Sequence, residues 1–247
     1  MKTIGILMTP AMALAVRENR KTETRRLPSK QPDAKWKHLG GFRFCTQDTL
    51  LCKTGECGCD VTVKHRYGEA GDELYIKETF WRLGKWVKNG FTKGHVRKGK
   101  WRPTMQKWRF KGGSGKLNPN SGDSTYSFAA PESKPKREEV GWHKRPAIFM
   151  PRDVARTRLK LLSVGFERLH EITEAGATNE GCEPRVEHCE DCDSDFCELA
   201  GGVEDCNGFS VSAKMLYQSL WDSINAARGH GWEKNEWVVV LKFEVVK

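Results

Sequence analysis

Runs of apolar and alternating residues dominate this chain, and they predict strands more often than helices. Strand-like stretches cover residues 3–8, 60–64, 73–81, 124–129, 154–164 and 236–246. Apolar positions at helical spacing predict helices over residues 10–19, 172–180 and 213–228. Pro10 opens the first helix, Thr173 and Ser212 are the expected N-caps of the other two, and Gly229 ends the last. The pattern predicts an α+β protein made mainly of short strands.

Three long polar stretches interrupt these elements. Residues 28–58 contain cysteines and are expected to be irregular, residues 82–145 are basic and rich in tryptophan, and residues 182–210 are acidic and rich in cysteine. The hydrophobic fraction of 38% is low for 247 residues, as expected if these stretches are insertions. We therefore expect a single domain over residues 1–247, a small, partly open β-barrel with flanking helices and three insertions.

Charge and cysteine content narrow the class of partner and the compartment. The formal net charge of +10 favours a polyanionic partner, with nucleic acid ahead of an anionic membrane. No stretch is predicted to span a membrane, because the apolar run at residues 1–8 is too short and ends at Pro10. We expect a cytoplasmic protein without membrane contact, in which nine cysteines are metal ligands or free thiols rather than disulfides.

A compact cationic stretch follows the first predicted helix. Five cations fall within ten residues, interleaved with two threonines: Arg17, Arg20, Lys21, Arg25 and Arg26. They form a candidate anion site, in which Lys21 is the one cation that can also act as a base once it loses its proton. The alternative is a solvated basic helix end that is favourable against the helix dipole.

The spacing within this stretch resembles a family signature. Asn19-x-Lys21-x-x-Thr24-x-Arg26 resembles the Gly-x-Lys-x-x-Glu-x-Arg signature of the ASCH domains, which belong to the PUA-like β-barrels associated with RNA. The stretches 71–81, 146–152 and 220–225 resemble further blocks of the family, the last two as seen in phage and prophage members. Asn19 replaces the signature glycine, and asparagine tolerates the left-handed conformation of such a turn.

Thr24 takes the place of the signature glutamate. With this change the stretch resembles the small bacterial amidohydrolases that deacetylate N4-acetylcytidine. In that branch a lysine, a threonine and a later glutamate form the site, and the resemblance carries these roles to Lys21, Thr24 and Glu180. Thr24 would then attack an amide carbonyl, neutral Lys21 would take its proton, and Glu180 would position Lys21 or activate water. The alternative is that the same residues contact phosphate without catalysis.

The basic segment from Arg82 to Lys116 holds twelve lysines and arginines and no acidic residue. Such cations neutralise phosphates, while tryptophans stack on unpaired bases. With the cationic stretch, the candidate nucleic-acid contacts are Arg20, Arg25, Arg26, Trp86, Arg97, Lys98, Lys100, Trp101, Arg102, Trp108 and Arg109. The alternatives are a disordered basic loop or tryptophans that pack on the barrel wall.

Two groups of cysteines are candidate ligands for structural zinc. Cys189-x-x-Cys192 with Cys197 and Cys206 offers four thiolates for a tetrahedral site. Cys45, Cys52, Cys57 and Cys59 offer a second set with poorer spacing. One mixed site, or reduced thiols without metal, are the alternatives, and no organic cofactor is expected.

Three functions remain open from the sequence. The first is recognition of RNA, in preference to DNA, or of a modified nucleoside, extended to hydrolysis of an N-acylated base such as N4-acetylcytidine. The second is a non-catalytic nucleic-acid-binding accessory protein of a phage, which would act in the host cytoplasm. The third is a nuclease, for which no evident histidine or carboxylate pair is present.

Overall fold

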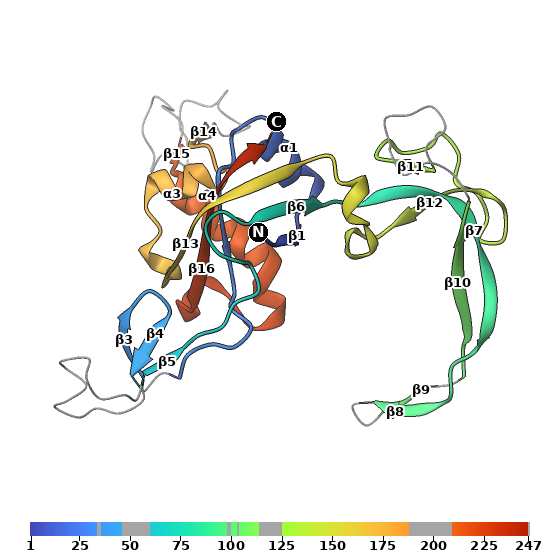
Figure 1. The fold of residues 1–247 in the computed structure, drawn as a ribbon, viewed down its shortest axis with the longest axis horizontal. Helices are drawn as coiled ribbons and strands as arrows, with labels where there is room; N and C mark the ends of the chain where they lie inside the picture. Colours follow the sequence, from blue (N-terminus) through green and yellow to red (C-terminus); the bar gives the residue numbers. More distant parts are fainter. Residues whose placement is uncertain are drawn as a thin grey trace, which may run out of the picture. The chain divides into compact units, whose positions relative to one another are not determined.

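The computed structural model describes residues 1–33, 36–45, 60–97, 100–102, 104–113, 125–187 and 209–246 (Figure 1). The chain forms two compact units. The first contains residues 1–4, 11–74 and 157–247, and the second contains residues 5–10 and 75–156. Strands outnumber helices in both, so the predicted α+β class is confirmed.

A five-stranded sheet contains the longest described strands of the first unit. Its strands follow the order β1 (Thr3–Leu7), β6 (Glu73–Lys77), β13 (Arg158–Arg168), β16 (Trp237–Val246) and β2 (Glu23–Arg26). β16 pairs antiparallel with both β13 and β2. The order ends at β1 and β2, so the described strands of this sheet do not close into a barrel.

A bulge in β13 explains why its sequence shows no single period. The register with β16 shifts between Leu161 and Ser163, so Leu159 and Leu161 are buried before the bulge and Phe166 is buried after it. An extra residue moves all later side chains to the other face of the strand. The strand therefore covers residues 158–168 instead of the expected 154–164.

The described part of this unit contains three α-helices: α1 (Pro10–Arg17), α3 (Glu174–Asn179) and α4 (Ala213–Asn225). The expected caps are present, because the Thr173 hydroxyl accepts from the Gly176 amide at 3.0 Å and the Ser212 hydroxyl from the Met215 amide at 3.3 Å. After a short 3₁₀ turn, Gly229 adopts the left-handed conformation with φ of 84°.

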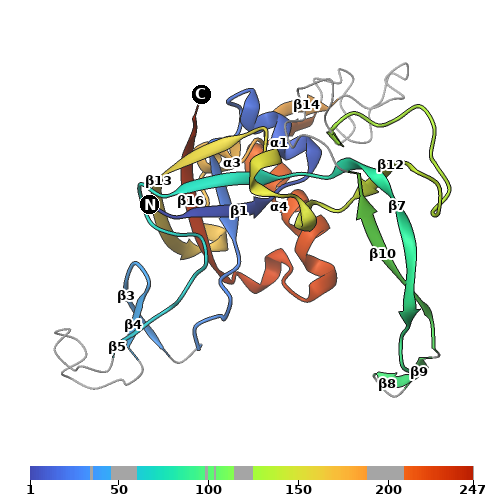
Figure 2. The ribbon, with the colours of Figure 1, turned by 45° about the vertical axis from the view of Figure 1, so that its right-hand side comes forward.

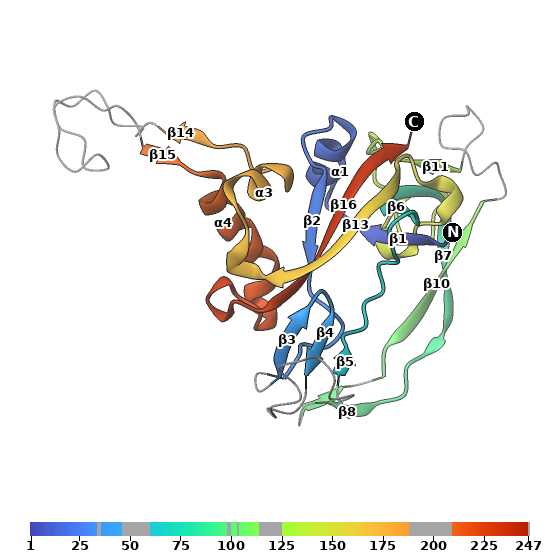
Figure 3. The ribbon, with the colours of Figure 1, turned by 60° about the vertical axis from the view of Figure 1, so that its left-hand side comes forward.

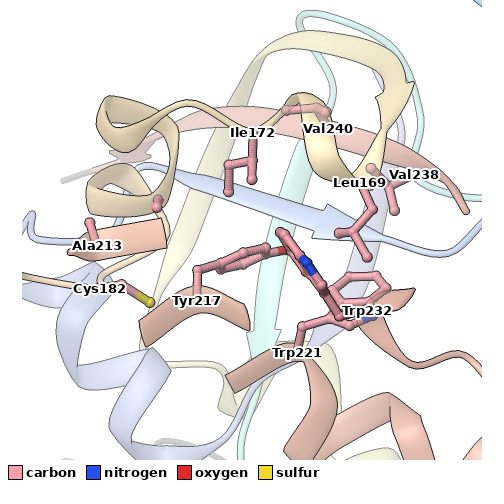
Figure 4. Packing of buried hydrophobic residues seen from close by; sticks show 10 residues of the cluster. Leu169, Ile172, Cys182, Ala213, Tyr217, Trp221, Trp232, Val238 and Val240 are labelled. Carbon is pink, nitrogen blue, oxygen red and sulfur yellow. The ribbon is translucent and has the colours of Figure 1, made fainter. Parts of the chain in front are cut away.

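Helices α3 and α4 pack together on one face of the sheet (Figure 3). Tyr217 and Trp221 of α4 lie beside Trp232 in a buried apolar cluster, together with Val238 and Val240 of β16 (Figure 4). The alternate residues of a strand point to one face, so this cluster covers that face of β16.

A small antiparallel sheet stands where an irregular insertion was expected. It comprises β3 (Lys37–Gly40), β4 (Arg43–Cys45) and β5 (Asp60–Thr62). Phe44 of β4 is 1% exposed and contacts Trp237 edge to face, with ring centroids 5.1 Å apart, while Phe166 stacks on Trp237. The expectation of irregular structure over residues 28–58 is therefore wrong for residues 37–45, which are anchored by aromatic burial.

The second unit is built on the long strand β7 (Phe80–Phe91). It pairs antiparallel with β10 (Gln106–Gly112), β11 (Tyr126–Ser127) and β12 (Gly141–Arg145). Figure 2 shows β10 running along the later half of β7. The basic segment thus forms an antiparallel ribbon in its described part, which excludes the disordered-loop alternative there.

Two short ribbons complete the described strands: β8 (His95–Arg97) with β9 (Lys100–Arg102), and β14 (Arg185–Glu187) with β15 (Phe209–Val211). The remaining short helices are 3₁₀ turns at Ala147–Phe149, Arg152–Val154, Leu169–Glu171, Ala226–Arg228 and Trp232–Lys234. None of the helices in the described part of the chain is both long and apolar enough for a membrane span.

Asn19 adopts the left-handed conformation expected from its place in the signature, with φ of 58°. Asparagine and glycine accept this region readily, whereas a β-branched residue does not. We expect Asn19→Gly to leave the free energy of unfolding within about 0.5 kcal/mol of wild type, and Asn19→Val to lower it by about 1–2 kcal/mol. Urea unfolding checks both, and equal stability of the two variants contradicts the assignment.

Candidate functional site

The turn at Asn19 directs Lys21 into the interior of the first unit. The backbone amides of Arg20 and Lys21 both donate to the Ala15 carbonyl of α1, at 2.9 and 3.1 Å. The Lys21 side chain then enters the protein and is only 1% exposed. Its Nζ donates to the Glu180 carbonyl at 2.8 Å and to the carboxylate of the same residue. Among the described residues, Glu180 is therefore the one partner of the Lys21 ammonium.

Glu180 connects three segments that are distant in sequence. It is the C-cap of α3 and lies 159 residues from Lys21. One carboxylate oxygen accepts from the Lys21 ammonium, and the other accepts from the Arg25 backbone amide in β2. Glu180 is 4% exposed, so both its charge and that of Lys21 are removed from water and compensated locally.

The structure thus brings together two of the three residues to which the resemblance assigns catalysis. Thr24 is also buried, at 3% exposed, and pairs in register with Leu241 of β16. Because side chains alternate along a strand, Thr24 lies on the opposite face of β2 from Glu23 and Arg25.

Arg25 is held by carboxylates on several sides. Its Nε donates to Glu167 at 2.7 Å, its Nη2 lies 3.5 Å from Glu23, and its Nη1 lies 3.6 Å from Glu180. Burial alone would lower the pKa of Arg25, but Glu180 and Glu167 outweigh it and raise that pKa. Arg25 is therefore a fixed cation in the interior.

A polar cleft of about 320 Å³ opens beside Arg25. Its charged and amide side chains come from β2, β13, α3, β16 and the turn after β13: Glu23, Arg25, Glu167, Glu171, Asn179 and Lys242. Glu23 accepts from the Asn179 side-chain amide at 3.3 Å and lies 3.7 Å from the Lys242 ammonium. The cleft therefore offers carboxylate acceptors next to a cationic wall.

Two buried protic groups lie near the Lys21–Glu180 pair. Burial, and to a smaller extent Glu180, raise the pKa of Cys182 to about 11, while Lys21 opposes the shift. Burial also raises the pKa of Tyr217 well above its ordinary range, again with Glu180 acting in the same direction. The Tyr217 hydroxyl is buried without a hydrogen-bond partner in the described structure. Both groups stay protonated at neutral pH.

The other candidate nucleic-acid contacts fall in different environments. Arg20 is half exposed and pairs with Glu18, and Arg26 is partly buried in β2. In the second unit, Lys100 and Arg109 are exposed. The ribbon of β8 and β9 contains Arg97, Trp101 and Arg102, and Lys98 lies outside the described residues.

Trp86 and Trp108 already stack on arginines of their own unit. The guanidinium of Arg145 lies 4.8 Å from the Trp86 ring centroid, and that of Arg137 lies 5.1 Å from the Trp108 ring centroid. Both tryptophans are partly buried. Their faces are therefore engaged by cations, as cation–π attraction favours.

Of the candidate zinc ligands, Cys45 lies within the described residues. Cys45 is 1% exposed in β4. Cys52, Cys57 and Cys59, as well as Cys189, Cys192, Cys197 and Cys206, lie outside the described residues. Within the described ranges, histidine, cysteine, aspartate and glutamate form no group of three or more suited to a metal ion.

Sequence reasoning missed the carboxylates that line the cleft. Glu23 lies inside the cationic stretch, where the all-polar sequence of residues 23–26 shows no apolar alternation that would indicate a strand. Glu167 gave no sign either, because the bulge in β13 hides which of its residues face the cleft.

Comparisons of the chain with protein-family models, with curated proteins and with solved structures find no match.

Removal of one partner of the Lys21–Glu180 pair leaves a buried charge without compensation. We expect Lys21→Met to lower the free energy of unfolding by about 3–5 kcal/mol, and the double variant Lys21→Met, Glu180→Gln to lose less than Lys21→Met alone. Lys160→Met is the matched control, because Lys160 pairs with Glu244 on an exposed part of the same sheet. Urea unfolding in which Lys21→Met and Lys160→Met behave alike contradicts the role of the pair.

The raised pKa of Cys182 predicts slow thiol chemistry at pH 8. The folded protein holds this proton more tightly than the unfolded chain, with a pKa of about 11 against 9.0. This stabilisation is therefore complete below pH 9 and is lost as the pH rises towards 11. Alkylation followed by peptide mass spectrometry should label Cys182 slowly in the native protein at pH 8 and faster towards pH 11. Native labelling at pH 8 as fast as in urea contradicts the assignment.

Proposed function

We propose that this protein recognises a nucleoside unit of RNA, and that the base is held in the cleft beside Arg25. The observation that carries the proposal is the polar cleft of about 320 Å³ fixed by the Lys21–Glu180–Arg25 contacts. This volume is at the lower end of ordinary small-molecule sites. A PUA-like barrel of the ASCH type, suggested by the signature around Lys21, is part of the same proposal.

The chemistry of the cleft walls suits a base that carries an amino or amide group. The carboxylates of Glu23, Glu167 and Glu171 accept hydrogen bonds from exocyclic N–H groups, as acidic side chains do from cytosine. Arg25 and Lys242 offer donors for a carbonyl or an acyl oxygen. Donors and acceptors thus lie close together, as pairing with a base edge requires.

The net charge supports a polymeric ligand over a free nucleoside. The basic segment from Arg82 to Lys116 provides the excess of cations that attracts a phosphate backbone. The cleft then recognises the base, and the basic segment binds the backbone. Base contacts determine which nucleotide is bound, whereas phosphate contacts position the polymer on the protein.

Isothermal titration calorimetry with cytidine and N4-acetylcytidine tests the cleft. We expect Glu167→Gln to weaken nucleoside binding about tenfold or more, because a charge-assisted acceptor and the clamp on Arg25 are both lost. Glu244→Gln is the matched control, since Glu244 pairs with Lys160 on the neighbouring strand outside the cleft. Equal affinities of the two variants contradict the location of the site.

Amide hydrolysis is a second candidate, favoured by the contact between Lys21 and Glu180 across 159 residues. This reaction requires the acyl group on the face of β2 that carries Thr24, opposite the cleft beside Arg25. There Thr24 attacks the acyl carbonyl, Lys21 takes the hydroxyl proton and returns it to the leaving amine, and water then releases the acyl group as a carboxylate. Lys21 must lose a proton before it can act, and Glu180 then orients the amine.

Release of cytidine from N4-acetylcytidine separates hydrolysis from binding alone. If Thr24 is the nucleophile, we expect the nearly isosteric Thr24→Val to abolish turnover while it leaves nucleoside affinity within about threefold of wild type. Turnover that survives in Thr24→Val excludes this role for Thr24. Nucleoside binding without turnover in the wild type favours a non-catalytic binding protein.

A further inference from the structure

Three glycines meet side by side on the sheet of the second unit. The register places Gly84 of β7 opposite Gly112 of β10 and opposite Gly141 of β12. A Cβ at Gly112 would lie 2.5 Å from the guanidinium carbon of Arg82, and a Cβ at Gly84 would lie 2.7 Å from the Phe110 ring. The absence of side chains at these positions lets Arg82 and Phe110 lie directly on the strand backbones.

Two arginines share the aromatic ring of Phe110. The guanidinium of Arg82 lies 5.7 Å from the Phe110 centroid and 5.1 Å from that of Tyr126. The guanidinium of Arg145 lies 4.6 Å from the Phe110 centroid and 4.8 Å from that of Trp86. Alternation along β7 and the register of its partners put these groups on one face of the sheet.

The two guanidiniums have no counter-charge in the described structure. No carboxylate of the described residues is paired with either arginine, and the buried Nε of Arg82 has no hydrogen-bond partner. Burial lowers the pKa of Arg145, and the positive charge of Arg82 lowers it further. Two like charges are therefore held together by aromatic rings, with their donors unused.

We propose that Arg82 and Arg145 form a binding site for a backbone phosphate of single-stranded RNA. The proposal rests on the proposed function, since it assumes that the polymer is RNA. Planar guanidiniums present forked donors that match phosphate oxygens, and stacking fixes both forks before the ligand arrives. A bound phosphate also removes the repulsion between the two arginines.

An exposed ring beside the arginines fits a nucleotide better than a free anion. Phe149 is 60% exposed, and its ring centroid lies 4.9 Å from the Arg145 guanidinium. A base adjoining the bound phosphate can stack on the open face of this ring. Trp86 then positions Arg145 and does not itself bind a base, which revises the role expected for Trp86 from the sequence.

Fluorescence anisotropy with a short labelled single-stranded RNA tests the site in the full-length protein. We expect Arg145→Gln and Arg82→Gln each to weaken binding about tenfold or more and to reduce the slope of log affinity against log salt by about 0.7. Arg145→Lys retains the charge but loses the fork, and an intermediate affinity is expected. Lys144→Gln is the control, because it removes the same charge from the same strand. Lys144 is exposed and lies on the other face of the sheet.

The outcomes separate this site from the proposed function. Equal losses in Arg145→Gln and Lys144→Gln overturn the phosphate site, while nucleoside binding in the cleft stands or fails by its own titration. If the wild type binds no RNA, inorganic phosphate is the second probe. If phosphate raises the melting temperature of the wild type but not that of Arg145→Gln, the anion site stands and its phosphate comes from a ligand other than RNA. No rise in either protein overturns it.

Discussion

The buried ion pair between Lys21 and Glu180 is the contact on which the first unit depends. It joins the turn after α1 to the end of α3, and the second carboxylate oxygen of Glu180 fixes β2 through the Arg25 amide. Desolvation of two charges offsets much of their attraction, so the pair contributes more to the specificity of this arrangement than to its net stability. By placing β2, it also places the Arg25 guanidinium against Glu167 and so shapes one wall of the cleft.

Arg25 in the first unit and the pair Arg82 and Arg145 in the second are held by different kinds of contact. In the first unit, Arg25 is surrounded by carboxylates, which balance its positive charge inside the protein. In the second unit, Arg82 and Arg145 are held by aromatic rings, and their charge remains available to a ligand. For Arg82 the difference agrees with composition, because the segment from Arg82 to Lys116 contains no acidic residue. A protein that reads a base in one place and a backbone in another requires both kinds of site.

The sequence was informative where one local rule decided the structure. The caps Thr173 and Ser212 and the left-handed Asn19 were predictable, because each follows from the chemistry of a single residue at a chain end or turn. The sheet formed by β3, β4 and β5 was not, because its stability comes from packing of Phe44 on Trp237, nearly two hundred residues later. The cleft was missed for the same reason, since its walls come from five separate elements.

Nitrogen-15 NMR of side chains in the presence of N4-acetylcytidine tests the central claim, that the cleft beside Arg25 holds a base. Asn179 and Arg25 carry side-chain N–H groups at the cleft, so their resonances report contact directly. The account predicts saturable shifts of the Asn179 amide and the Arg25 Nε–H signals at nucleoside concentrations that match the calorimetric affinity. Binding that leaves both signals unmoved, while resonances of β7 and β10 shift, contradicts it.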